Sequence, residues 1–184
     1  EKNFVNGNLH GKSIRLYEDG KECAIEYFED GLLMQASYYT NNHEEISSIK
    51  EGNGKKAYFS ENHLQELREY QDGEERGQVI QFNPGGKTIA IYHVKDGKKN
   101  GVETRYFTSK TINNLKPSIT MEWFDGMLQG TVKTWYSSGT LESQREYMSN
   151  YKQGLSMAWY LDGSVMLIEE YEKDRLSRGE YRKK

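Results

Sequence analysis

Short runs of strand-forming residues alternate with glycine and Asx residues along the whole chain. Residues 131–136 and 164–171 are examples, rich in the aromatic and β-branched side chains that favour strands. Glycine, aspartate or asparagine interrupts the pattern every eight to twelve residues, which is too often for ordinary helices. The pattern therefore predicts an all-β chain of short strands and turns.

The turn dipeptides recur at a regular interval, and self-comparison aligns them. The clear examples are Asn6-Gly7, Asp30-Gly31, Asp72-Gly73, Asp96-Gly97 and Asp125-Gly126. Glu51-Gly52 fills the gap in this series, while Asn150-Tyr151 and Asp174-Arg175 continue it in degraded form. From Gly7 to Arg175 there are 168 residues in seven steps, which gives a repeat of 24 residues.

Further glycines and aromatic residues recur at matched offsets within each repeat. A second glycine follows the turn glycine by four residues, an aromatic residue follows five or six residues later, and another turn glycine comes soon after. The repeat glycines are Gly7, Gly11, Gly20, Gly31, Gly73, Gly77, Gly97, Gly101, Gly126, Gly130, Gly139, Gly154 and Gly163. We interpret them as structural, because tight hairpin turns require the positive φ angles that glycine adopts at little cost.

The repeated aromatic residues should hold neighbouring hairpins together. An isolated hairpin is marginally stable in water, whereas stacked hairpins bury side chains against one another. The predicted aromatic stripe comprises Tyr17, Phe82, Tyr106, Trp135, Tyr136, Trp159 and Tyr160. It has two interpretations, a packing core between repeats or a contact surface for a partner, since exposed Tyr and Trp dominate binding hot spots.

The predicted fold is an elongated, single-layer antiparallel β-meander that forms one repeat domain over residues 1–184. Its repeats span residues 7–30, 31–51, 52–72, 73–96, 97–125, 126–149 and 150–174, with a partial repeat at 175–184. Residues 40–64 have a weaker strand pattern. Residues 108–118 enlarge the fifth repeat, and we interpret them as a longer hairpin loop that is either a tolerated insertion or functional.

The repeat resembles the MORN repeat, with Gly-x-x-x-x-x-Tyr-x-x-Gly followed by Tyr-x-x-Gly-x-x-x-Gly. Residues 125–139 match best and residues 96–101 next. The chain is most similar to the looser bacterial variant found in antitoxin components of toxin–antitoxin pairs. The resemblance covers nearly the whole chain and departs from the pattern at Tyr151 and Arg175. It implies a twisted single-layer sheet that serves as a scaffold, with any catalysis in a separate domain, and it implies membrane association for some members.

Charge and composition narrow the range of possible binding partners. The net charge is −3 and the sequence pI is near 5.9, which disfavours a nucleic-acid partner. The basic C-terminal end suggests weak contact with anionic membranes through Arg178, Arg182, Lys183 and Lys184. No apolar run approaches the length of a membrane span, so the chain is expected to be soluble as given. Its first residue is Glu1 rather than Met, which leans slightly toward an exported or cell-envelope protein.

No motif for catalysis or for a cofactor stands out. The four histidines are widely spaced, and the single cysteine, Cys23, has no matched histidine motif. Gly52-Asn53-Gly54 followed by lysine lacks the spacing of a phosphate-binding loop. We therefore predict a non-enzymatic scaffold for protein–protein interaction without cofactor or metal, of which an antitoxin-like component is one form. The alternative is a membrane-peripheral adaptor that binds anionic lipid.

Overall fold

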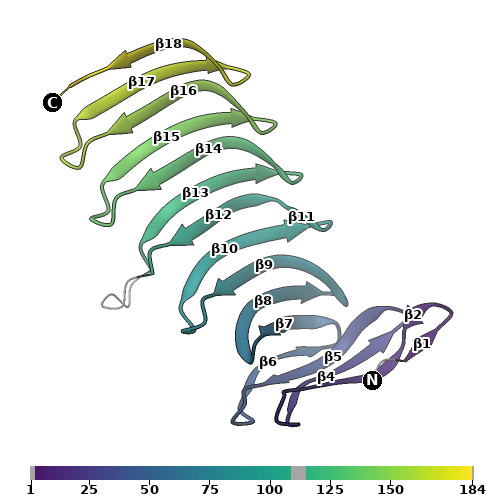
Figure 1. The fold of residues 1–184 in the computed structure, drawn as a ribbon. Coiled ribbons are helices and arrows are strands. Elements are labelled where there is room, and N and C mark those ends of the chain that lie inside the picture. The colour runs from purple at the N-terminus through teal and green to yellow at the C-terminus, as the bar shows by residue number, and fades with distance from the viewer. Residues whose placement is uncertain (1–2, 109–114, 184) are drawn as a thin grey trace. The chain divides into compact units, whose positions relative to one another are not determined.

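The computed structural model describes residues 3–108 and 115–183, and all regular structure within those ranges is β-strand. Within the described residues, sixteen strands from β3 to β18 form one open antiparallel sheet, while β1 and β2 form a separate two-stranded hairpin (Figure 1). The strands follow sequence order, except that β10 is next to β12 and the short β11 pairs with β10. The prediction of an all-β antiparallel meander is confirmed.

The strands are β1 (Phe4–Val5), β2 (Asn8–Leu9), β3 (Gly11–Leu16), β4 (Glu22–Glu29), β5 (Leu32–Tyr39), β6 (Glu45–Lys50), β7 (Asn53–Ser60), β8 (His63–Gln71), β9 (Glu74–Phe82), β10 (Thr88–Lys95), β11 (Lys98–Lys99), β12 (Gly101–Tyr106), β13 (Pro117–Phe124), β14 (Met127–Trp135), β15 (Leu141–Met148), β16 (Tyr151–Trp159), β17 (Val165–Glu172) and β18 (Arg175–Tyr181).

Two kinds of turn connect these strands. Two-residue tight turns such as Asp125-Gly126, with φ of 48° and 79°, have both residues in the left-handed region that closes a hairpin. Longer wide turns, such as the one over residues 136–140, close the opposite ends of the strands. All thirteen predicted repeat glycines have positive φ.

The last two tight turns lie one residue earlier than the sequence predicted. Their left-handed residues are Ser149-Asn150 (φ 49° and 70°) and Lys173-Asp174 (φ 47° and 65°). Tyr151 is instead the first residue of β16, as Arg175 is of β18. The physical reason is that Asn and Asp tolerate the left-handed region better than larger side chains, so they take the second turn position that glycine holds elsewhere.

The irregular region over residues 40–64 forms complete strands, β6 and β7, around the tight turn at Glu51-Gly52. A second tight turn at Glu61-Asn62 (φ 48° and 64°) takes the place of a wide turn. This substitution shortens the local repeat. In the enlarged fifth repeat, β12 ends at Tyr106 and β13 begins at Pro117, and residues 109–114 lie outside the described residues.

The chain divides into two compact units, which are described separately. The N-terminal unit comprises residues 1–87 and 94–97, and the C-terminal unit comprises residues 88–93 and 98–184. The division falls within β10.

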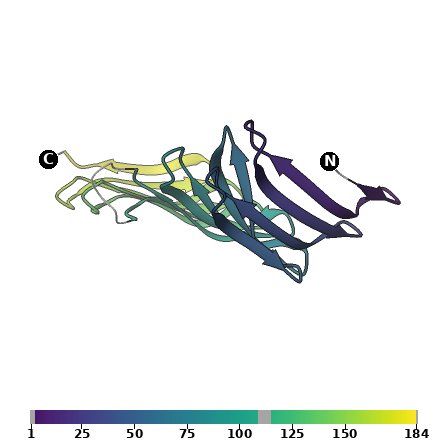
Figure 2. The ribbon, with the colours of Figure 1, turned by 90° about the horizontal axis from the view of Figure 1, so that it is seen from below.

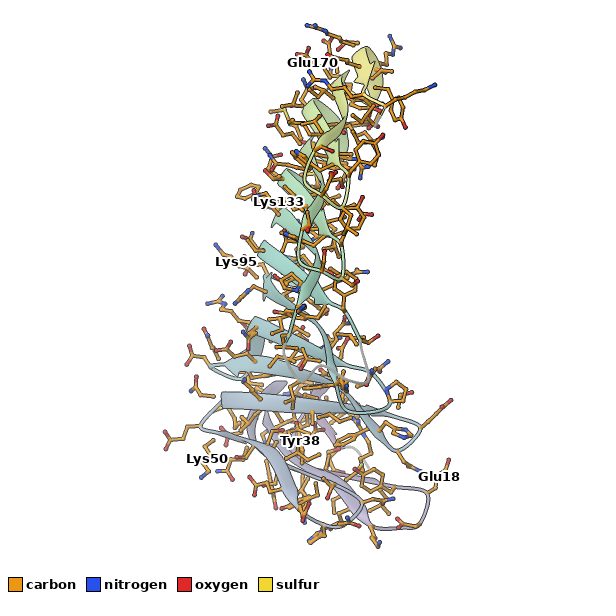
Figure 3. All side chains as sticks on the ribbon, turned by 90° about the vertical axis from the view of Figure 1, so that its left-hand side faces the viewer. Glu18, Tyr38, Lys50, Lys95, Lys133 and Glu170 are labelled. Atoms are coloured by element: carbon orange, nitrogen blue, oxygen red, sulfur yellow. The ribbon has the colours of Figure 1, made fainter. Side chains whose placement is uncertain are left out.

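The sheet of the N-terminal unit curls on itself and buries a hydrophobic core (Figure 2). Tyr17, at the end of β3, meets Phe59 of β7 edge to face, with ring centres 5.7 Å apart. Tyr38 is completely buried and lies inside the unit (Figure 3). The buried core comprises Tyr17, Cys23, Ala24, Phe28, Leu33, Ala36, Tyr38, Ile49 and Ala57.

Three tight-turn ends meet at one edge of this curl. The Gly73 N–H donates to the Gly52 carbonyl (2.9 Å), the Gly52 N–H donates to the Met34 carbonyl (2.9 Å), and the Leu33 N–H donates to the Gly73 carbonyl (3.0 Å). A Cβ at Gly73 would lie 2.7 Å from the Leu32 Cβ, which is closer than real Cβ contacts. Glycine is thus required here by close packing as well as by its φ of 83°.

The C-terminal unit packs mainly on one face of its sheet, which we call its packed face. Directly paired residues share a face in an antiparallel sheet. The row that defines the packed face is Glu103, Met121, Val132, Arg145, Ser156 and Glu169. Side chains project from both sides of the ribbon in this unit (Figure 3), and we call the second side its outer face.

Candidate functional site

The predicted aromatic stripe occupies two different positions in the fold. Tyr17, Tyr136 and Tyr160 are the first residues of wide turns, where each carbonyl accepts the N–H of the turn glycine three residues later. Phe82, Tyr106, Trp135 and Trp159 are one position earlier, as the last residues of β9, β12, β14 and β16. All seven are buried or half-buried.

The three wide-turn tyrosines link successive hairpins. Each hydroxyl donates to a main-chain carbonyl 22 or 23 residues further along: Tyr17 to Tyr39 (2.6 Å), Tyr136 to Trp159 (2.9 Å) and Tyr160 to Arg182 (3.0 Å). We call these bonds the tyrosine clamps. They use the polar end of each side chain within the fold, which favours packing as the role of these three residues. The role of the stripe as a binding surface stays a prediction.

The second glycine of a repeat gives room to a glutamate on the paired strand. A Cβ on Gly77, Gly130 or Gly154 would collide with the carboxylate of the residue eight positions earlier, Glu69, Glu122 or Glu146 respectively. The Glu69 carboxylate also accepts the Gln78 N–H (2.8 Å), and that of Glu146 accepts the Leu155 N–H (3.3 Å). In these two hairpins the glutamate thus satisfies a main-chain donor where the strand bulges.

The N-terminal unit contains a buried ion pair. The Lys56 ammonium lies 2.9 Å from the Glu26 carboxylate, and the side chains are 12% and 6% exposed. The Tyr38 hydroxyl donates to the same carboxylate (2.8 Å). Burial, together with the neighbouring Glu26 charge, raises the pKa of Tyr38 well above its usual value. The phenol therefore stays protonated and serves as a donor.

Aromatic rings surround the same ammonium. Lys56 Nζ lies 5.7 Å from the ring centre of Phe28, 5.4 Å from that of Tyr58 and 5.9 Å from that of Tyr70. Burial and the hydrogen-bonded Tyr58 hydroxyl raise the pKa of Tyr70. The Glu26 carboxylate, the Lys56 ammonium and the surrounding rings thus form one connected network of contacts.

A similar cluster lies on the packed face of the C-terminal unit. The Glu103 side chain, only 1% exposed, accepts hydrogen bonds from Lys99 (2.5 Å) and Arg105 (2.7 Å). Burial opposes ionisation of Glu103, but these two cations prevail and hold its pKa below the usual value. The Lys99 ammonium also lies 4.5 Å from the ring centre of Tyr92 and 5.0 Å from that of Trp123.

The outer face of the C-terminal unit carries an exposed hydrophobic group that the sequence analysis did not identify. Phe124 pairs with Met127 across one tight turn, and Met148 pairs with Tyr151 across the next. Their exposed fractions are 63%, 38%, 55% and 53%. The two turns are adjacent, because the Asn150 N–H donates to the Leu128 carbonyl (3.0 Å) and the Asn150 side-chain oxygen accepts the Leu128 N–H (2.8 Å). We call these four residues the tip patch.

The other tight turns show that the backbone does not require a hydrophobic tip patch. At least one residue of each flanking pair is polar there: Val5 and Asn8, Glu29 and Leu32, Lys50 and Asn53, Ser60 and His63, Gln71 and Glu74, Lys95 and Lys98, Glu172 and Arg175. The turn geometry is the same in all of them, so hairpin formation does not explain four large apolar side chains at two neighbouring turns. The signal was present in the sequence, as apolar residues on both sides of the turns at 125–126 and 149–150.

The basic residues predicted to meet a membrane lie in and after β18, apart from Lys184, which is outside the described residues. The Arg182 guanidinium pairs with the Glu180 carboxylate (2.8 Å), and Arg178 is the cross-strand partner of Glu170. Acidic residues are thus interleaved with the basic ones. Among the described residues of this segment, acidic neighbours therefore offset part of the positive charge.

Comparison with known proteins adds no relative. No protein-family model matches the chain, and no curated protein matches it significantly. The likeness to MORN repeats therefore stays a prediction. Within the described ranges, 3–108 and 115–183, no helix has the length and apolarity needed to cross a membrane, and no group of three or more His, Cys, Asp or Glu residues is arranged to hold a metal ion.

Proposed function

We propose that this protein is a non-enzymatic scaffold that binds another protein through the tip patch of its C-terminal unit. The observation that carries the proposal is the internal comparison of the tight turns. At each of the other tight turns at least one residue of the flanking pair is polar, while Phe124, Met127, Met148 and Tyr151 are all large and exposed. Contiguous exposed apolar surface on a soluble protein typically marks an interaction site. Aromatic and methionine side chains are the types enriched in interfaces.

The charged clusters support a role without catalysis. The Glu26–Lys56 pair and the Glu103 cluster each join several strands, and their charged groups are used to hold those strands together. The basic residues at the end of the chain offer less support to the alternative role at an anionic membrane, because Arg182 is paired with Glu180. Neutralisation of a toxin is the form of protein binding that the MORN resemblance implies.

A double substitution in the tip patch tests this proposal. The purified wild-type chain and the double variant Phe124→Ser/Met148→Ser are each incubated with cell extract, and bound proteins are cross-linked to them. The proteins recovered with the two chains are then compared. The matched control is Gln71→Ser/Glu74→Ser at a polar tight turn. We expect the control to recover the same specific proteins as the wild type. The tip-patch variant should lose them, because removal of central apolar anchors from an interface costs about 2 kcal/mol or more, roughly 30-fold in affinity.

A direct binding measurement then checks the partner. The recovered protein, or the product of an adjacent gene, is purified and titrated against the three chains by calorimetry. Equal affinities for the wild type and the tip-patch variant would refute the proposal. Near-identical circular dichroism and melting temperatures of all three chains are the control for folding, since exposed substitutions usually change stability by less than about 0.5 kcal/mol.

A further inference from the structure

In the N-terminal unit, β4, β5 and β6 are neighbouring strands of the sheet (Figure 1). Residues of these three strands line a recessed surface. It is a groove of about 570 Å³. Ile25, Ser37 and Ser48 are directly paired across the three strands and form one row of it. Tyr27 and Gln35 form the next row. A volume of this size suits a small ligand of two or three rings.

The pair Tyr27 and Gln35 departs from a pattern that three other hairpins share. In three other hairpins the residues at these two positions are a glutamate and the glycine that makes room for its carboxylate, as in Glu122 and Gly130. Here an aromatic ring and an amide stand in their place. Tyr27 is 41% exposed, and Lys12 Nζ lies 6.0 Å from the centre of its ring. Tyr27 thus contributes an exposed aromatic surface to the groove.

The polar side chains in the groove are available to a ligand. Among the described residues, the side chains of Gln35, Ser37 and Ser48 make no hydrogen bond with another protein group, nor does the Tyr27 hydroxyl. The backbone of β5 is used by its ladders with β4 and β6. A ligand in the groove must therefore be recognised by side chains, which here supply an amide and three hydroxyl groups beside an aromatic ring.

The charge around the groove disfavours an ionic ligand. Lys50, Glu45 and Glu51 all line the groove, so groups of both signs are present. An extended peptide is also disfavoured, because peptides that join a sheet bond to a free strand edge and this groove lies over a sheet face. A neutral polyhydroxylated ligand fits best: its C–H surface can lie on the Tyr27 ring while its hydroxyl groups bond to Gln35, Ser37 and Ser48. We propose that the β4–β6 groove binds a neutral oligosaccharide.

Amide chemical shifts in ¹⁵N-labelled protein test the site with defined probes, namely maltotriose, cellotriose and chitotriose. We expect at least one of them to shift the amides of residues 25, 27, 35, 37 and 48 saturably. A shallow open groove implies a dissociation constant of about 1 mM, so each probe is added to about 20 mM. A Ser/Gly-rich decapeptide serves as the comparison ligand. No groove shift with any sugar, or tighter binding of the decapeptide at the same amides, would overturn the proposal.

Three variants assign the interaction to the groove. Tyr27→Ala should weaken sugar binding by at least about tenfold, since the ring supplies the apolar contact, while Tyr27→Phe should keep most of it. Tyr151→Ala, which removes an exposed tyrosine in the tip patch, should leave sugar binding unchanged. Unchanged binding by Tyr27→Ala would refute the assignment. Because Tyr151→Ala tests the other surface, failure of the sugar site and failure of the protein-binding proposal are separate results.

Discussion

The tyrosine clamps make a graded prediction, because the same hydrogen bond occurs at three degrees of burial. Tyr17 is 7% exposed and its hydroxyl lies 2.6 Å from the Tyr39 carbonyl. Tyr136 is half-buried, and the bond of Tyr160 to the Arg182 carbonyl is exposed to solvent. Substitution of each tyrosine by phenylalanine removes the hydroxyl and keeps the ring. The cost should therefore follow the access of water to the abandoned carbonyl.

The expected magnitudes follow from that access. A net hydrogen bond contributes about 0.5–1.5 kcal/mol, and a buried acceptor left without a partner costs about 1–3 kcal/mol. We expect Tyr17→Phe to lower the free energy of unfolding by about 2 kcal/mol, Tyr136→Phe by about 1 kcal/mol and Tyr160→Phe by less than about 0.5 kcal/mol. At a urea dependence of about 1.5 kcal/mol per molar, the first change moves the midpoint by roughly 1.3 M.

The positions of the tryptophans make the assay specific. Trp123, Trp135 and Trp159 all belong to the C-terminal unit, so tryptophan fluorescence reports the unfolding of that unit while circular dichroism reports both. If the two units unfold separately, Tyr17→Phe should move the unfolding transition of the N-terminal unit to lower urea concentration. This change should be seen by circular dichroism and not by tryptophan fluorescence. Tyr136→Phe should shift the fluorescence transition. An equal cost at Tyr160 and Tyr17, or no measurable cost at Tyr17, would refute the burial argument.

Three further predictions concern the turns and the buried phenols. Gly130→Ala should lower the free energy of unfolding by about 2–3 kcal/mol, because it combines a strained φ of 113° with a collision with the Glu122 carboxylate. Gly139→Ala, with φ of 100° and open space around the added Cβ, should lower it by only about 1 kcal/mol; equal urea midpoints by fluorescence would contradict the role of the carboxylate. Asn150→Gly should change the free energy of unfolding by less than about 0.5 kcal/mol, since relief of backbone strain offsets the lost hydrogen bond to the Leu128 N–H. Asn150→Ala should lower it by about 1–2 kcal/mol, and the opposite order in urea unfolding would disprove the assignment of the turn to Ser149-Asn150. Burial raises the pKa of Tyr17, Tyr38 and Tyr70 above the unfolded value of about 10, so their contribution to stability is complete below pH 10 and is lost as the pH rises further. The free energy of unfolding of the N-terminal unit, measured by urea titration at several pH values, should therefore fall above pH 10, and it should fall less steeply in Tyr38→Phe.

Local backbone chemistry made the strand pattern readable from the sequence alone. The tight turns at 30–31, 72–73 and 125–126 combine aspartate with glycine, and a left-handed hairpin turn accepts few other pairs. The strand order follows from these short connections, because a two-residue turn can only join neighbouring antiparallel strands. The tight turns at 61–62, 149–150 and 173–174 carry weaker signals, since they have no glycine, and the last two were therefore placed one residue late.

The tertiary structure alone decided which side chains meet. The contact of Lys56 with Glu26, and the meeting of Gly73 with Leu33, depend on how tightly the sheet curls, which is a sum of small twists that no local motif specifies. The same holds for the tip patch and the β4–β6 groove. Tyr27 and Phe124 are equally apparent as aromatic residues in the sequence, but their exposure depends on what the fold leaves uncovered. Turn chemistry thus determined the order of the strands, and long-range packing determined the surfaces available for binding.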